Sequence, residues 1–171
     1  MTEDRESHGS RMRLARRLAA LHPSGMIHGA LVMGATLALM SDKTAAEVSL
    51  LGAGGVLTIY WLSHAYTHAL GRGMDGDHDH LALRLVRSTR HEAPVFWGGL
   101  PPLLVTAGVL VAGGEVGAAM LAGLWVTVVL MAGYGYLAAH QAGVVGWRAA
   151  AETTFAALLG LFMVALNTLL H

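Results

Sequence analysis

The feature that most constrains the fold of this chain is a series of five long stretches without Asp, Glu, Lys or Arg. They are between 18 and 32 residues long and occupy residues 23–41, 48–71, 93–114, 116–147 and 153–170. A helix that crosses a bilayer needs about 20 apolar residues, with a range of about 17–25. Because a backbone in lipid must satisfy its own hydrogen bonds, these stretches predict transmembrane helices.

Composition agrees with a membrane protein. Charged residues make up 13% of the 171-residue chain, whereas a soluble domain has about 25%. This argues against a disordered chain and against an ordinary soluble enzyme domain. The chain has no cysteine, which excludes disulfides, Cys-ligated zinc, iron–sulfur clusters and thiol catalysis.

We therefore predict an all-α, polytopic transmembrane helical bundle. The five expected spans lie near residues 24–41, 47–70, 94–113, 116–139 and 148–170. The alternative has four spans and an interfacial N-terminal helix. Residues 1–23 form a basic, amphipathic leader, and residues 24–171 form one transmembrane domain whose only sizeable loop is 72–92.

The distribution of Lys and Arg predicts the orientation. Five basic residues precede the first span, four lie in loop 72–92 and one lies between the fourth and fifth spans, whereas Lys43 alone falls on the other side. Cytoplasmic loops carry the excess of Lys and Arg. We expect a multi-pass protein of the plasma membrane, with the leader and loop 72–92 cytoplasmic and the C-terminus outside. This agreement favours five spans over four.

Small residues recur at a spacing of four, which suits close contact between helices in a membrane. The motifs are Gly25-x-x-x-Gly29, Ala30-x-x-x-Gly34 and Ala119-x-x-x-Gly123. We expect these motifs to contact other helices of the bundle. They also permit a homo-oligomer or a larger membrane protein partner within the lipid bilayer.

Ten histidines are the main chemical signal, and nine fall on the expected cytoplasmic side. His64 and His68 share one face of a helix, since residues four apart are neighbours. If the second and fourth spans are adjacent, His140, Glu92 and Glu152 converge on this pair. Such a set suits a divalent transition metal. The alternative is that these side chains hydrogen-bond water and headgroups at the interface.

A second candidate lies in the polar loop, where acidic and imidazole side chains cluster. Its residues are Asp75, Asp77, His78, Asp79 and His80. The spacing fails as an EF-hand, because glycine is not at the sixth position and the twelfth is Val86. We favour a solvated acidic turn that offsets nearby arginines over a metal site.

The rest of this loop is helical in pattern. Leu81, Leu85 and Val86 fall on one side of a short helix that we expect on the cytoplasmic surface. Thr89-x-x-Glu92 resembles a capping box that opens the third span, which would give Glu92 a structural role.

Haem is a cofactor that we favour less than a metal ion, although His28, His64, His68 and His140 offer axial ligands at one depth. No nucleophile elbow, P-loop or dinucleotide-binding fingerprint is present in the chain. The basic loop is too short to indicate nucleic-acid binding.

Several short motifs of the chain resemble small actinobacterial integral membrane proteins of unassigned function. They are Tyr60-Trp-Leu-Ser-His64-Ala-Tyr66, the basic segment before Pro94, Gly133-Tyr-Gly-Tyr136, Gly146-Trp-Arg148 and Leu169-Leu-His171. The resemblance implies a multi-span membrane protein and supplies no activity or cofactor.

We accordingly expect a binding or accessory membrane component without catalysis of its own. The alternative is a metal- or proton-handling protein, either a transporter or a metal-dependent enzyme, which uses the cytoplasmic His/Glu cluster.

Overall fold

The computed structural model describes residues 22–41, 43–76 and 79–170, and these ranges contain α-helices and no strand. The helices are α2 (Pro23–Leu39), α3 (Ala46–Met74), α4 (Leu81–His91), α5 (Ala93–Val111), α6 (Val116–Gln141) and α7 (Trp147–Leu170). The all-helical prediction is confirmed. The predicted amphipathic leader falls almost entirely on residues 1–21, which lie outside the described residues.

Four helices, α3, α5, α6 and α7, are long and apolar enough to cross a membrane, and α2 is a shorter apolar helix of 17 residues. Most helix ends lie within two residues of the predicted ones. The exception is α3, which continues to Met74, four residues beyond the predicted end. Its 29 residues span about 44 Å at 1.5 Å per residue, more than the hydrocarbon core of about 30 Å. Helix α3 is therefore longer than a helix that crosses this core without tilting needs to be.

Helix α2 occupies the centre of the bundle, because it packs against α3, α5, α6 and α7. Its small residues allow the close approach. A Cβ atom added at Gly29 would meet the backbone of α5 at Val95 and Gly99, and one added at Gly34 would meet Thr127 of α6. The prediction that these motifs lie at helix contacts is confirmed.

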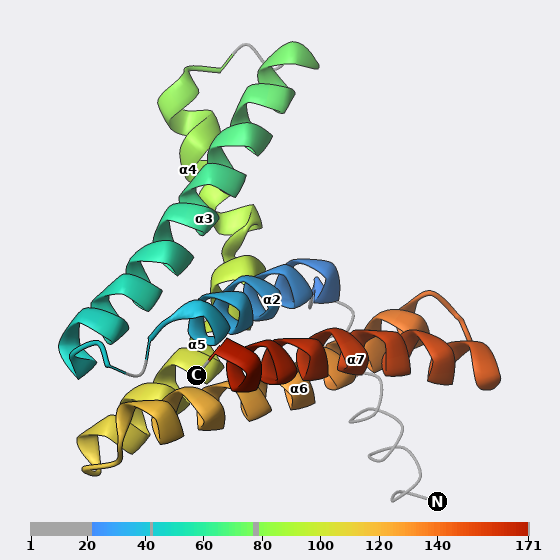
Figure 1. The fold of residues 1–171 in the computed structure, drawn as a ribbon. Helices are drawn as coiled ribbons and strands as arrows, with labels where there is room; N and C mark the ends of the chain where they lie inside the picture. The colour runs from blue at the N-terminus through green and yellow to red at the C-terminus, as the bar shows by residue number, and fades with distance from the viewer. Residues whose placement is uncertain (1–21, 42, 77–78, 171) are drawn as a thin grey trace, which may run out of the picture.

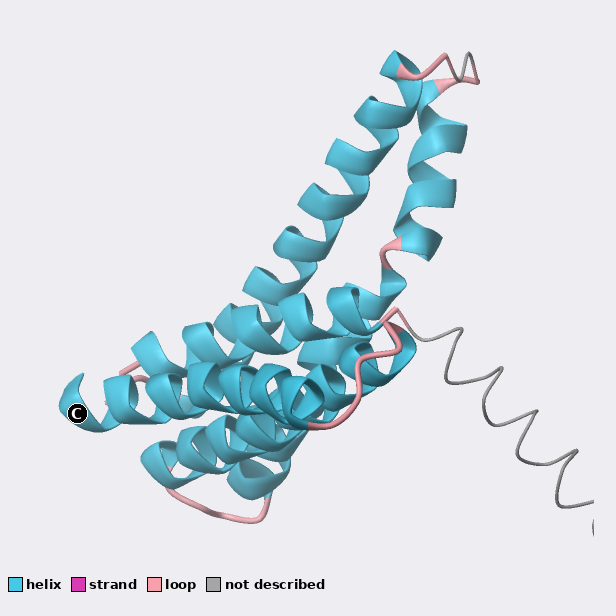
Figure 2. Ribbon diagram, turned by 90° about the vertical axis from the view of Figure 1, so that its right-hand side faces the viewer, coloured by secondary structure: helices cyan, strands magenta, loops and turns pink. Residues whose placement is uncertain are grey.

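The six helices form two groups (Figure 1). Helices α6 and α7 lie side by side, with α2 against them, whereas α3 and α4 project away from this base as a helical hairpin (Figures 1 and 2). The indole N–H of Trp61 in α3 donates a hydrogen bond to the carbonyl of Thr89 in α4, at 3.3 Å. The hairpin is therefore held by a polar contact as well as by packing.

The predicted short helix of loop 72–92 is present as α4, but the predicted capping box is wrong. Thr89 lies inside α4, and its hydroxyl donates to the carbonyl of Val86 at 2.9 Å. Glu92 occupies the N-cap position of α5 without a side-chain capping bond. The capping box does not form because α4 continues through Thr89, where the box would start. The Glu92 carboxylate is directed toward His68 of α3 instead.

Candidate metal centre

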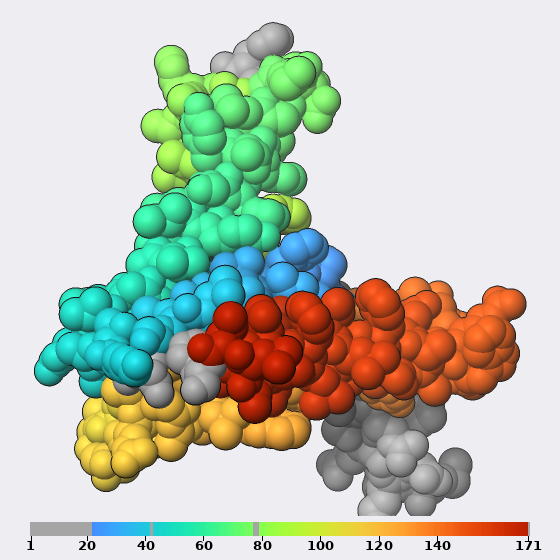
Figure 3. Space-filling model, viewed as in Figure 1, coloured from blue at the N-terminus to red at the C-terminus, as the bar shows by residue number. Residues whose placement is uncertain are grey.

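A cavity of about 530 Å³ lies in the angle between α2 and the projecting hairpin of α3 and α4. Figure 3 shows this hairpin (green) standing above the N-terminal part of α2 (blue). Ten of the 14 lining residues have polar or titratable side chains. They are His22, Ser24, His28, His64, Thr67, His68, Arg72, Asp75, His91 and Glu92. Half of the ten histidines therefore border one cavity.

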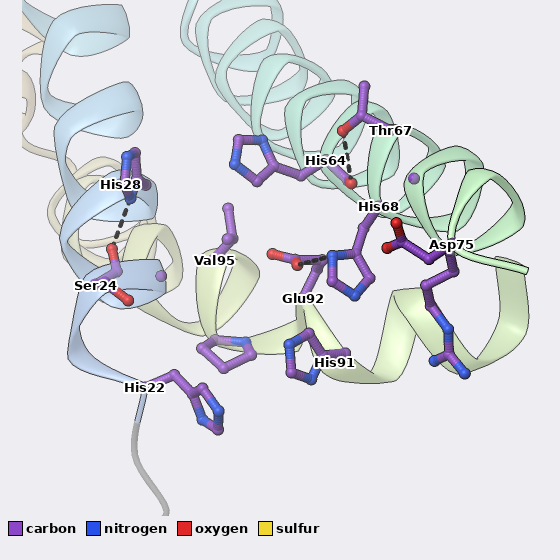
Figure 4. Close-up of a pocket in the computed structure, with 14 residues that line it drawn as sticks. His22, Ser24, His28, His64, Thr67, His68, Asp75, His91, Glu92 and Val95 are labelled. Atoms are coloured by element: carbon purple, nitrogen blue, oxygen red, sulfur yellow. Dashed lines mark hydrogen bonds and ion pairs between the residues drawn. The ribbon is translucent and has the colours of Figure 1, made fainter. Parts of the chain in front are cut away.

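Three of these side chains form a compact group, which we call the triad: His68, His91 and Glu92. One ligand atom of each lies within 4.8 Å of the other two. The Nδ1 atom of His68 is 3.7 Å from Oε1 of Glu92. The rings of His68 and His91 are stacked, with centres 4.9 Å apart. Figure 4 shows the three side chains pointing toward one another from α3 and from the α4–α5 junction.

The spacing of the triad is close to that of ligands on one metal ion. Zn–N bonds of about 2.0–2.1 Å in a tetrahedral site place neighbouring ligand atoms about 3.3 Å apart. The His68–Glu92 separation of 3.7 Å is within a few tenths of an ångström of that value. The third ligand atom, on His91, lies within 4.8 Å of the other two, and its ring must turn out of the stack with His68 to direct a lone pair at the same ion.

Local structure explains why these residues meet. His91 is the last residue of α4 and Glu92 is the N-cap of α5, so the junction presents two adjacent side chains to the cavity. Opposite them, positions 64, 68, 71 and 75 of α3 follow the spacing of one helix face. A Cβ atom added at Gly71 would meet nothing within 4 Å, so this glycine leaves the cavity open.

A second pair of histidines borders the same cavity one helical turn away. His28 of α2 and His64 of α3 have ring centres 5.9 Å apart, and the ring of Tyr60 lies 4.9 Å from that of His64. The Nδ1 atom of His28 is 2.7 Å from the carbonyl oxygen of Ser24. A carbonyl oxygen only accepts, so Nδ1 is the donor, and in the neutral ring the lone pair is on Nε2.

The structure does not bring His140 and Glu152 to this cavity. Helix α3 packs on α2, α4 and α5. The second and fourth predicted spans, α3 and α6, therefore do not meet the condition of adjacency on which this convergence depended. His140 borders a separate pocket of about 520 Å³ between α6 and α7, together with Tyr136. Glu152 is exposed on α7 and lines neither pocket. Of the five residues His64, His68, His140, Glu92 and Glu152, the first two and Glu92 share this cavity.

The acidic loop contributes one residue to the cavity. Asp75 forms the C-cap of α3 and lines the cavity. Asp79 pairs with Arg87 of α4, as expected of an acidic turn that offsets arginines, and His80 is the exposed N-cap of α4. Asp77 and His78 lie outside the described residues. Metal binding by this loop stays a prediction.

Sequence reasoning left His91 and His22 out of the metal set. His91 immediately precedes Glu92, and that adjacency at the start of a span was the available signal. His22 lies next to it, with ring centres 5.5 Å apart. Nothing in the spacing along the chain could place His22, because it reaches the cavity only through the packing of α2 on α5.

Comparison of the chain with protein-family models, with curated proteins and with solved structures found no match in any of the three.

Proposed function

We propose that this protein is an integral membrane protein that binds a divalent transition-metal ion such as Zn²⁺ through His68, His91 and Glu92. The observation that carries the proposal is the convergence of three ligand atoms within 4.8 Å of one another. Imidazole and carboxylate ligands suit zinc, iron, nickel or copper(II). The absence of cysteine from the chain disfavours a metal that selects thiolates.

The position of the cavity supports binding rather than passage. Its lining comes from the first residues of α2, the last three turns of α3 and the α4–α5 junction, which lie at one end of these helices. The ring of His22 lies beside that of His91, with centres 5.5 Å apart, but His22 is outside the group whose ligand atoms all lie within 4.8 Å of one another. The position of the cavity favours a binding or accessory component.

We place this end of the bundle on the cytoplasmic side of the plasma membrane. Loop 72–92 carries four arginines, and the leader carries five more, so the positive-inside rule assigns both to the cytoplasm. Five spans, with α2 as the first, bring all but one of the basic residues to that side. The 17 residues of α2 are within the range of helix lengths that cross a bilayer.

Counting bound metal in the purified protein tests the proposal. The protein is prepared in detergent with a tag that contains no histidine and is dialysed against Zn²⁺ or Co²⁺. Loss of a residue that only orients a ligand lowers metal affinity about 10–100-fold. The double variant His68→Ala/His91→Ala should therefore bind its tightest ion at least about tenfold more weakly, whereas His140→Ala should match the wild type.

Three results would overturn the proposal. The first is a wild-type protein that retains neither Zn²⁺ nor Co²⁺, and the second is a double variant with unchanged affinity. The third is a Soret band in the absorption spectrum of the purified protein that disappears in His68→Ala/His91→Ala. That band would identify haem as the occupant of these histidines.

A further inference from the structure

We propose that His28 and His64 form a second binding position for the same class of metal ion. It lies one helical turn nearer the start of α3 than His68 of the triad. This inference rests on the proposed function. It assigns a role to two histidines that border the cavity but lie outside the triad. The cavity would then hold two ions in separate places rather than one ion shared by all of its histidines.

The separation of the two rings fits coordination of one ion. With a Zn–N bond of about 2.05 Å and about 1.2 Å from nitrogen to ring centre, two imidazoles on a tetrahedral ion have centres about 5.3 Å apart. The same bonds give about 6.5 Å when the imidazoles lie opposite each other. The observed 5.9 Å between His28 and His64 lies between these limits.

The hydrogen bond of His28 prepares its ring for a metal. Metal-bound histidines generally donate their other ring N–H to a carbonyl or carboxylate, which fixes the tautomer and the ring orientation. Nδ1 of His28 makes this contact with the Ser24 carbonyl at 2.7 Å. The remaining nitrogen, Nε2, therefore has a lone pair to offer, and Figure 4 shows the ring at the edge of the cavity that faces His64.

The spacing along α3 keeps the two positions separate. His64 and His68 are four residues apart, which is about 6 Å along the helix axis. That separation exceeds the distance of about 3.5–4 Å between the ions of a two-metal catalytic site. Glu92 and Asp75 place carboxylates in the same cavity, which offsets part of the repulsion between two cations.

The pair borders the end of the cavity that is nearest the middle of α3, because the lining includes no residue of α3 before His64. His28 is exposed and His64 is half-buried, so both rings can be reached from solvent. Water would fill the remaining coordination positions of the ion bound by this pair.

Equilibrium dialysis against Co²⁺, with metal counted per chain, tests the second position. We expect about two Co²⁺ per wild-type chain and about one in His28→Ala/His64→Ala, with the affinity of the remaining ion unchanged. The single variants His28→Asn and His64→Asn should each lose the same ion. A quadruple alanine variant that also lacks His68 and His91 gives the background from other histidines. Melting temperatures in detergent confirm that each variant is folded.

The outcomes separate the two proposals. One Co²⁺ in the wild type, with no loss in His28→Ala/His64→Ala, overturns the second position and leaves the triad intact. No Co²⁺ above the background of the quadruple variant overturns the proposed function itself. Two ions in the wild type and one in each His28 and His64 variant support both.

Discussion

Replacing Gly29 by alanine tests whether the central position of α2 holds the bundle together. A Cβ atom at this position would lie 2.9 Å from the backbone nitrogen of Gly99 and closer still to the carbonyl oxygen of Val95. Ordinary van der Waals contact begins at 3.4 Å. Helices α2 and α5 must therefore separate by at least 0.5 Å at Gly99, the difference between these two distances, and by more at Val95.

The expected cost follows from the rigidity of what the new methyl group meets. Overpacking of a close-packed interior destabilises a protein by about 1–3 kcal/mol, because neighbours must leave their preferred positions. The atoms near Gly29 belong to the backbone, which cannot rotate away as a side chain can. We expect a loss in the upper half of that range.

Gly108→Ala is the matched control, because a Cβ atom there meets nothing within 4 Å and the site lies in α5. Both variants are unfolded reversibly with SDS in mixed micelles, and their free energies of unfolding are compared. A difference below about 0.5 kcal/mol, the usual range for changes at unconstrained surface positions, would refute the packing of α2 at the centre. It would favour the alternative in which this helix lies on the membrane surface.

Three further predictions concern the cavity and the topology. Metal binding should weaken as the pH falls, because protons compete with the metal ion for the imidazole nitrogens. A Co²⁺ affinity that is independent of pH would exclude histidine ligands. Gly71→Leu should slow Co²⁺ uptake, because the leucine side chain fills open space in the cavity. Gly55→Leu, on the same helix and with equally open surroundings but outside this cavity, should not. Equal stopped-flow rates in the two variants would contradict binding of the ion in this cavity. The chain has no native cysteine, so single cysteines can report the orientation. Lys43→Cys should react with an impermeant thiol reagent added outside intact cells, and Asp79→Cys should not. The opposite pattern would reverse the proposed orientation.

The sequence by itself determined the helices and their approximate ends. The length of the charge-free stretches sets the spans, because a bilayer forces any apolar segment of that length to form a helix. The pattern of Leu81, Leu85 and Val86 also located α4, since its polar and apolar faces differ strongly. The small residues identified which faces of α2 and α6 are closely packed.

Some helix ends depended on neighbours instead. Helix α3 continues to Met74, past the end of the apolar stretch, because α4 folds back along it and packs against those last turns. For the same reason Thr89 lies within a helix rather than at its start. A local capping pattern could not anticipate that packing.

Only the tertiary structure decided which histidines meet. His64 and His68 were identifiable from their spacing on one helix face, but their partners lie on other helices. The chain places His28 and His91 beside them and leaves His140 between α6 and α7. The physical reason is that α3, α5 and α6 are apolar around most of their circumference, so periodicity along the sequence does not specify which helices are neighbours. Close contacts at Gly29, Gly34 and similar positions set that order instead.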